Sequence, residues 1–156
     1  MDLQKTLAFL EEVEGFRSEP YLDNKGVPTI GIGTVYYSDG SKVTMQDHEC
    51  TREQAESWAT ERIEKDSQEI LNACLPFVPN DNQLIALLSF SYNEGLHALK
   101  TSSLLHFLIT GHPDLAALEF AKWNKITVNG EKVEDKGLSN RRAKEKALFL
   151  QAWKTS

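Results

Sequence analysis

The sequence predicts an α+β fold in which a small antiparallel sheet lobe is joined by a long helix to a mainly helical lobe. Residues 16–45 alternate β-forming side chains with glycines and turn clusters, and helical apolar spacing resumes after residue 51. No linker, repeat or low-complexity segment divides the 156 residues. We therefore predict one domain over residues 1–156, with the sheet lobe at about 14–50 and the helical lobe at about 75–156 together with the N-terminal helix.

The first half of the chain supplies a helix, a sheet and the start of a long helix. Residues 2–13 carry apolar side chains at helical spacing, and Gly15 is placed to end that helix. Turn clusters at 23–26 and 38–41 predict two or three antiparallel strands. A capping box over residues 51–54 opens the long helix, whose loose apolar spacing suits a connection with solvated faces.

The second half is mostly helical. Asn80 is placed to cap a helix that ends near Gly95. Three later helices are expected, opening at residues 101–103 and ending at Gly111, running from Pro113 to Trp123, and running from Ser139 to Trp153. Between the last two, the Asn-Gly pair within residues 126–133 is flanked by β-formers and predicts a hairpin. A sheet lobe beside a helical lobe favours a cleft for an extended polymer.

The composition excludes several classes of function. Lys and Arg number 17 against 23 Asp and Glu, so the net charge of −6 would repel a polyphosphate, despite a basic cluster at 136–146. We therefore expect no nucleic-acid partner. Apolar runs fall far short of the ~20 residues of a membrane span, and the N-terminus lacks the features of a secretory signal. No stable membrane insertion and no self-directed export are expected.

No metal or other cofactor is expected either. Cys50 and Cys74 lack the spacing of metal ligands, and the four histidines are dispersed. Two reduced thiols are the ordinary interpretation. A disulfide between Cys50 and Cys74 is possible only if the fold brings the two cysteines together in an oxidising compartment.

The most informative group of residues is Glu14, Asp23 and Thr29, which place two carboxyls and a hydroxyl close together in a segment rich in glycines and turns. Two carboxyls that flank a bond are what glycoside hydrolysis needs. Each residue also has an ordinary interpretation. Glu14 could be a solvated acid, Asp23 a turn former and Thr29 a residue that suits a strand. The three residues alone leave these alternatives open.

The order of several motifs resembles the tailed-phage lysozymes, which are endolysins with muramidase activity. The N-terminal signature reads Glu14-Gly15, Tyr21-Leu22-Asp23 and then Gly26-Val27-Pro28-Thr29-Ile30-Gly31-Ile32-Gly33. Further similar blocks lie at 90–95, at 101–104, and at Trp123 with 137–145. These four ordered blocks cover almost the whole chain. One departure is Thr34, which stands where many members of the family carry His directly after the Gly-x-Gly.

The resemblance implies a lysozyme-like fold and hydrolysis, with inversion, of the β-1,4 bond between N-acetylmuramic acid and N-acetylglucosamine in peptidoglycan. Glu14 is expected to be the general acid, Asp23 the carboxylate that orients the attacking water, and Thr29 its helper. Glu14 precedes Gly15 in the last helical turn, where the helix dipole and the desolvation of a cleft would raise its pKa. Tyr92, Ser103 and Val35 are the expected substrate-binding residues. For Tyr92 and Ser103 the alternative interpretation is a structural role, in helix packing or helix capping.

The resemblance also implies a setting. The partners are peptidoglycan glycan strands, with no cofactor, and the protein is expected to be a monomer. Like the soluble members of the family, it would wait in the host bacterial cytoplasm and reach the wall in the periplasm through a holin-type membrane lesion. Two other functions stay open: a lytic transglycosylase acting on the same bond, and a catalytically idle peptidoglycan-binding module, to which Thr34 is the only pointer.

Several residues near these motifs have two interpretations. Gly31 and Gly33 fit the close approach of a ligand to the backbone, or merely a bent strand. Arg17 could pair with a nearby acid and orient the site, or lie on the surface. One of Arg141 and Arg142 is expected to brace the domain through ion pairs, with contact to the wall polymer as the weaker option.

Overall fold

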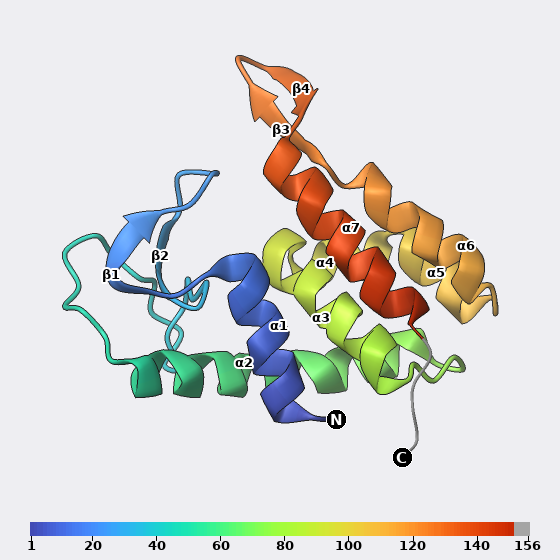
Figure 1. Cartoon of the computed structure of the whole chain (residues 1–156), viewed down its shortest axis with the longest axis horizontal. Coiled ribbons are helices and arrows are strands. Elements are labelled where there is room, and N and C mark those ends of the chain that lie inside the picture. The colour runs from blue at the N-terminus through green and yellow to red at the C-terminus, as the bar shows by residue number, and fades with distance from the viewer. Residues whose placement is uncertain (152–156) are drawn as a thin grey trace. The chain divides into compact units, whose positions relative to one another are not determined.

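The α+β class predicted from the sequence is confirmed by the computed structural model, which describes residues 1–151 (Figure 1). These residues form seven α-helices, one short 3₁₀ helix and two small antiparallel sheets. The chain divides into two compact units, the first spanning Met1–Lys65 and the second beginning at Asp66. Both units contain helices and a two-stranded sheet, and helix α2 (Arg52–Cys74) contributes residues to each.

The first unit begins with helix α1 (Leu3–Glu14), as predicted. The Asp2 side chain accepts a hydrogen bond from the backbone N–H of Lys5, which satisfies a donor that a helix start leaves unpaired. Gly15 ends the helix with a φ of 75°, a conformation that glycine adopts without a steric penalty. Leu10 is fully buried and anchors the helix in the core of this unit.

Strands β1 (Arg17–Leu22) and β2 (Pro28–Gly31) form the predicted antiparallel sheet. Tyr21 pairs with Thr29 and Leu22 with Pro28, but the register shifts between Arg17 and Tyr21. Beyond β2 the chain makes two isolated bridges, of which one joins Ile30 to Thr34. The sheet is therefore a short, irregular hairpin rather than an extended surface.

The N-terminal part of α2 packs against β2. Its predicted capping box is confirmed, because Thr51 N–H donates to Gln54 Oε1 at 2.9 Å and Gln54 N–H donates to Thr51 Oγ1 at 3.1 Å. A Cβ added to Gly31 would lie 2.9 Å from the Cβ of Ala55 on α2. Gly31 therefore permits close packing of helix on strand, and this accounts for the glycine without a ligand.

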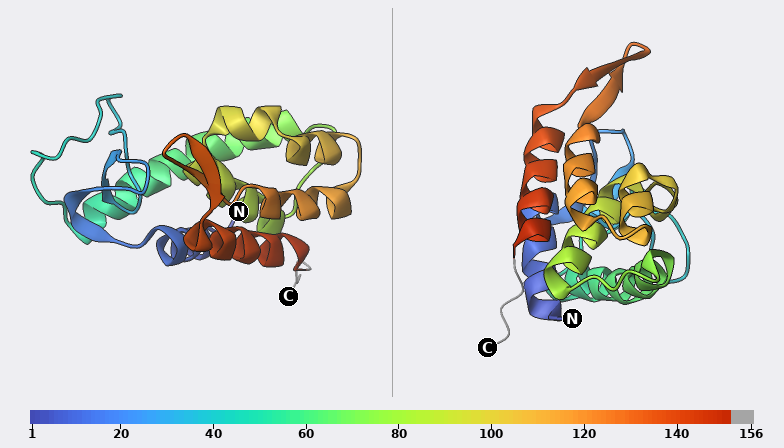
Figure 2. Two further views of the ribbon diagram at one scale, coloured as in Figure 1. Left: turned by 90° about the horizontal axis from the view of Figure 1, so that it is seen from above. Right: turned by 90° about the vertical axis from the view of Figure 1, so that its right-hand side faces the viewer.

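The second unit is a helical bundle with one projecting hairpin (Figure 2). The predicted cap Asn80 is confirmed at the start of α3, where Asn80 and Gln83 exchange hydrogen bonds of 2.8 and 2.9 Å and so form a capping box. The predicted hairpin is also confirmed and extends away from the bundle in the right-hand view of Figure 2. The elements of this unit after α2 are α3 (Asp81–Glu94), α4 (Leu96–Thr101), α5 (Ser103–Ile109), α6 (Pro113–Glu119), the 3₁₀ helix η1 (Phe120–Lys122), β3 (Lys125–Val128), β4 (Glu131–Glu134) and α7 (Lys136–Leu150).

The bundle differs from the sequence-based prediction in three places. Helix α4 is not predicted, and the helix expected from Pro113 to Trp123 changes to 3₁₀ geometry after Glu119. Helix α7 begins three residues before the predicted Ser139, because the Asp135 side chain accepts from Leu138 N–H and caps it. The predicted end of that helix at Trp153 lies outside the described residues.

Aromatic rings fill much of the core of the bundle. The Phe90 ring lies edge-on to Phe120, with centroids 5.9 Å apart, and to Trp123, with centroids 5.2 Å apart. Phe120 in turn contacts Phe149, so rings from α3, η1 and α7 meet in one cluster. Among residues 1–151, no helix combines the length and apolar character needed to cross a membrane.

Candidate active site

Glu14 is the last residue of α1, and the turn that carries it is held in place. Glu11, one turn earlier, forms a 2.7 Å ion pair with Arg52 at the start of α2. The Arg52 guanidinium also lies 4.5 Å from the centroid of the Phe16 ring, just after the helix end. Glu14 itself is half-buried. Arg52 therefore contacts a residue before Glu14 and a residue after it, and these contacts restrict the backbone that carries the Glu14 carboxyl.

Tyr21 and Thr29 share one face of the β1–β2 hairpin, and Asp23 follows at its turn. Side chains alternate between the two faces of a strand, and residues paired across an antiparallel ladder point to the same face. Tyr21 pairs with Thr29, and Asp23 follows Tyr21 by two positions. Leu22, between them, points to the other face and is 57% exposed. The hairpin thus places Tyr21 opposite Thr29, with Asp23 in the turn that follows Tyr21 by two positions.

Asp23 shapes the turn that joins the two strands. Its Oδ1 accepts hydrogen bonds from the backbone N–H groups of Lys25 at 2.8 Å and Val27 at 2.9 Å. The Asp23 carbonyl accepts from Gly26 N–H at 3.0 Å. The turn-forming interpretation of Asp23 is therefore confirmed. It does not compete with a chemical role, because these bonds also fix the orientation of the carboxylate.

Thr29 is buried, with 3% of its surface exposed. Its hydroxyl donates a 2.8 Å hydrogen bond to the carbonyl of Val27. A hydroxyl has one hydrogen and two acceptor lone pairs, so Thr29 Oγ1 can then only accept from any further partner.

Tyr21 connects these residues to Glu14. Burial raises the pKa of Tyr21, the Glu14 and Asp23 carboxyls raise it further, and Arg17 opposes them. The carboxyls of Glu14 and Asp23 therefore both lie within electrostatic reach of the Tyr21 phenol. Arg17 stacks on the Tyr21 ring, with its guanidinium carbon 4.4 Å from the ring centroid. The structure thus places Glu14 and Asp23 within reach of one tyrosine that pairs with Thr29, and the sequence indicates no separate role for that tyrosine.

Thr34 and Val35 follow the second strand. Thr34 is 4% exposed and exchanges two backbone hydrogen bonds of 2.9 Å with Ile30, the neighbour of Thr29. The position at which the family often has His is thus buried directly beside the strand that carries Thr29. Val35 is half-buried, and its carbonyl accepts from Val43 N–H at 3.0 Å.

Tyr92 and Ser103 belong to the second unit. Tyr92 lies near the end of α3 and is 6% exposed. Ser103 is the exposed first residue of α5, but the residue that caps this helix is Ser102, whose hydroxyl accepts from Leu105 N–H at 3.1 Å. The hydroxyl of Ser103 is therefore not used for capping. The substrate-binding roles of Tyr92, Ser103 and Val35 stay predictions.

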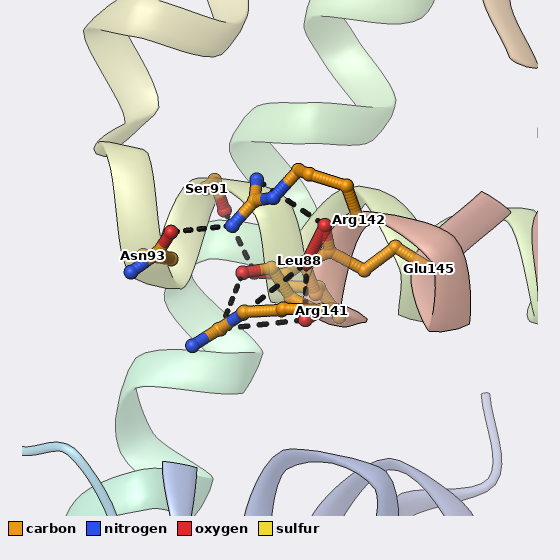
Figure 3. Close-up of polar contacts among 7 residues, drawn as sticks. Leu88, Ser91, Asn93, Arg141, Arg142 and Glu145 are labelled. Carbon is orange, nitrogen blue, oxygen red and sulfur yellow. Dashed lines mark hydrogen bonds and ion pairs between the residues drawn. The ribbon is translucent and has the colours of Figure 1, made fainter. Parts of the chain in front are cut away.

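The two arginines of α7 brace the second unit, although only one of them was predicted to do so (Figure 3). Both flank the fully buried carboxylate of Glu145, with ion-pair distances of 3.4 Å to Arg141 and 3.2 Å to Arg142. Ser89 on α3 donates to Glu145 Oε2 at 2.6 Å, and Arg142 donates to Asn93 Oδ1. Burial raises the pKa of Glu145, while Arg142 and Arg141 oppose that shift. With only 8% and 1% of their surfaces exposed, these arginines pack α7 on α3 and are poorly placed to bind a wall polymer.

Neither cysteine forms a disulfide. Cys50 and Cys74 are buried free thiols, and burial raises the pKa of Cys74 to about 11. Residues 1–151 also contain no group of three or more His, Cys, Asp or Glu side chains that could hold a metal ion.

Comparisons with known proteins agree on one family. The family model described as phage lysozyme matches residues 11–145. An endolysin of Bacillus phage PZA is 37% identical over 146 residues, which cover 94% of this chain and 54% of that protein. The chain thus spans about half the length of that relative.

Two solved structures share the fold over nearly their whole length. The endolysin from Escherichia coli O157:H7 phage FAHEc1 superposes with a TM-score of 0.85 at 34% identity, covering 100% of this chain and 98% of that one. The muramidase domain of SpmX from Asticaccaulis excentricus has a TM-score of 0.80 at 26% identity, covering 96% of this chain and 97% of that one.

Proposed function

Because the chain belongs to the phage lysozyme family, we propose that it hydrolyses the β-1,4 bond between N-acetylmuramic acid and N-acetylglucosamine in bacterial peptidoglycan. The likeness to a muramidase domain supports this choice of bond. The observation that carries the proposal is that the Glu14 and Asp23 carboxyls both raise the pKa of Tyr21, which supports a single site for the two carboxyls. Two carboxyls at one site are what cleavage of a glycosidic bond requires.

Glu14 is assigned as the general acid. A glycosidic oxygen is a poor leaving group and must receive a proton as its bond to the anomeric carbon breaks. Glu14 lies in a helical turn held by the Arg52–Glu11 ion pair, and it is half-buried rather than solvated on all sides. A carboxyl held in this way can present its proton at one point of the substrate, which supports the assignment.

Asp23 and Thr29 are assigned to the attacking water. The Asp23 carboxylate can only accept hydrogen bonds, and Thr29 Oγ1 can only accept because its hydrogen is donated to Val27. A water held between them must donate both of its hydrogens, so its lone pairs point away from both residues. We propose that a lone pair attacks the anomeric carbon on the face opposite the leaving group, while the glycosidic bond breaks and its oxygen takes the proton of Glu14. The Asp23 carboxylate stabilises the developing positive charge and accepts the proton that the attacking water loses. The product configuration is then inverted.

The substrate contacts and the setting are part of the same proposal. Val35, Tyr92 and Ser103 contact the saccharide, and the exposed Ser103 hydroxyl is accessible for a hydrogen bond. The chain acts as one catalytic domain and as a monomer, without a cofactor. It acts on glycan strands in the periplasm after a holin-type lesion releases it from the host cytoplasm.

The first experiment measures lysis by the wild type and by Glu14→Gln. The substrates are purified peptidoglycan and cells whose outer membrane has been permeabilised, and the readout is the fall in turbidity. Glutamine keeps the shape of the side chain but carries no proton that it can transfer, so we expect activity to fall by about 10³-fold with the thermal unfolding midpoint unchanged. Glu53→Gln, the same change at an exposed position on α2, is the matched control. Substantial lysis by Glu14→Gln would remove Glu14 from the acid role.

Product analysis separates the proposal from its rivals. Hydrolysis adds one water to each cleaved strand, whereas a lytic transglycosylase leaves an anhydro product that is lighter by one water in mass spectrometry. An NMR spectrum recorded in the first turnovers identifies the initial anomer, and a retained configuration would contradict the water-holding role of Asp23 and Thr29. A wild type that binds peptidoglycan but releases no fragments would identify an idle binding module.

A further inference from the structure

The Tyr21 hydroxyl has no hydrogen-bond partner among residues 1–151. This distinguishes it from the nearby Tyr37, whose hydroxyl donates a 2.7 Å hydrogen bond to Asp47. Tyr21 is nevertheless half-buried, and it lies on the hairpin face that carries Thr29, two positions before Asp23. A phenol that is partly withdrawn from water normally finds a partner for its hydroxyl. The hydroxyl is thus available to a ligand at the site of the two carboxyls.

The Tyr21 ring is held in place without using its hydroxyl. The Arg17 guanidinium lies 4.4 Å from the ring centroid, which is a cation–π contact. The register of the sheet shifts between these two residues, and such irregularities re-aim side chains. One face of the ring is covered by the arginine, while the polar edge stays in reach of Glu14 and Asp23. The ring is therefore ordered before a substrate arrives.

The electrostatic surroundings determine what the hydroxyl can bind. Burial, Glu14 and Asp23 together raise the pKa of Tyr21, so the phenol keeps its proton near neutral pH and acts as a donor. The Asp23 carboxylate disfavours a negatively charged acceptor, and the Arg17 cation stacked on the ring opposes that effect. The acceptor that we infer is a neutral oxygen, such as a sugar hydroxyl or an acetamido carbonyl, rather than the lactyl or peptide carboxylates of peptidoglycan.

We propose that Tyr21 is a substrate-binding residue whose hydroxyl donates a hydrogen bond to a neutral oxygen of the N-acetylated sugar held between Glu14 and Asp23. Arg17 acts as a positioning residue through its stack on the ring. This inference rests on the proposed function and deepens it, because it names the part of the substrate that the site recognises. The hydrogen bond fixes the sugar relative to the acid and the water, and geometry of this kind contributes to rate.

The test removes the hydroxyl alone by Tyr21→Phe. Because the hydroxyl has no protein partner to lose, we expect the thermal unfolding midpoint to stay at the wild-type value. We expect kcat/KM on soluble glycan strands to fall about tenfold, mainly through a higher KM, which is the effect of one lost hydrogen bond at a desolvated site. Tyr36→Phe, at a tyrosine that is 56% exposed in the same unit, should leave both quantities unchanged.

Tyr37→Phe provides the contrasting control. It removes the hydrogen bond to Asp47, so it should lower the unfolding midpoint and leave KM unchanged. If Tyr21→Phe behaves in this way instead, its hydroxyl has a structural role and the inference is wrong. Arg17→Gln should raise KM in wild type but have little further effect in Tyr21→Phe, because the arginine acts through the ring. If the effects of Arg17→Gln and Tyr21→Phe on KM are fully additive, that positioning role of Arg17 is wrong.

A binding measurement separates failure of this inference from failure of the proposed function. Glu14→Gln, with and without Tyr21→Phe, is titrated with soluble glycan strands by calorimetry. We expect the dissociation constant to rise about tenfold when the hydroxyl is absent. Equal affinities would overturn the role of Tyr21 even if the wild type cleaves the glycan. A wild type that cleaves nothing would overturn the proposed function, while a tenfold difference in affinity would still support the contact.

Discussion

The two hairpins of this chain are built differently. The pairing of β1 with β2 shifts register, and the turn between them is tied by the Asp23 carboxylate to two backbone N–H groups. The pairing of β3 with β4 is regular over four residue pairs. Its turn needs only Asn129 and Gly130 in left-handed conformations, with φ values of 52° and 81°.

The strands of the two hairpins also differ in how deeply they are buried. Three of the four residues of β2 are buried, and this strand packs on α2. All four residues of β4 are exposed. A regular hairpin with a tight turn needs little from the rest of the protein, whereas the irregular one depends on a carboxylate, a stacked arginine and a helix. Irregular backbone of this kind re-aims side chains, and the candidate catalytic residues gather where it occurs.

Asp23→Asn gives the largest effect expected from this comparison. The amide oxygen of asparagine can still accept the hydrogen bonds from Lys25 and Val27, so the turn should persist. The negative charge is lost, and we expect kcat to fall by 10²- to 10³-fold, that is by roughly 3–4 kcal/mol of transition-state stabilisation. Lysis rates on purified peptidoglycan give kcat, and the unfolding midpoint reports on the turn.

The reciprocal change, Asn129→Asp, is its control in the other hairpin. Aspartate also tolerates the left-handed region, so both activity and stability should stay near wild type. If Asp23→Asn lowers activity only in proportion to a fall in the unfolding midpoint, the carboxylate is needed for the turn and not for the reaction.

Alanine in place of one glycine from each hairpin tests the difference in packing. Gly31 and Gly130 have φ values of 67° and 81°, so alanine is strained in either place by about 1–2 kcal/mol. Only at Gly31 would the new Cβ also meet another atom, at 2.9 Å from Ala55 Cβ. We expect Gly31→Ala to lower the free energy of unfolding by about 1–3 kcal/mol more than Gly130→Ala, because overpacking adds to the strain. Denaturant titrations measure both values, and equal losses would mean that α2 can move away from β2.

Local signals account for most of the fold that was predicted correctly. The capping box at 51–54, the Asn80 cap and the Asn-Gly turn each specify a few hydrogen bonds between near neighbours, so they can be predicted without the rest of the chain. Helix α4 has no such signal, since the residue before it is Gly95, which offers no side chain to cap it. Because Gly137 is a poor helix former, the sequence does not indicate that α7 begins before it.

Less of the candidate site than of the fold could be predicted from the sequence. Glu14, Asp23 and Thr29 were recognised by the order of motifs, but the contact of Arg17 with Tyr21 depends on a shift of sheet register that no residue pattern encodes. The spacing of Tyr21 and Asp23 was the available signal, because it places the tyrosine two positions before the candidate carboxylate. Glu145 shows the same limit. It stands in a run of charged residues typical of a solvated helix face, and only the packing of α7 on α3 buries it.

Thr29→Val gives the smallest of the expected effects and tests the shared face directly. Valine has nearly the shape of threonine but lacks the oxygen that would accept from the water, so we expect kcat to fall about tenfold, which is about 1.4 kcal/mol. Loss of the hydrogen bond to Val27 should cost about 1 kcal/mol of stability. Thr29→Ser keeps the hydroxyl and should keep most of the activity, while Thr127→Val, on the exposed face of β3, should change neither quantity. Because Thr29 and Thr127 are both strand threonines, a drop in kcat confined to Thr29→Val would place the water in the irregular hairpin, and equal rates for the two valine variants would remove Thr29 from the reaction.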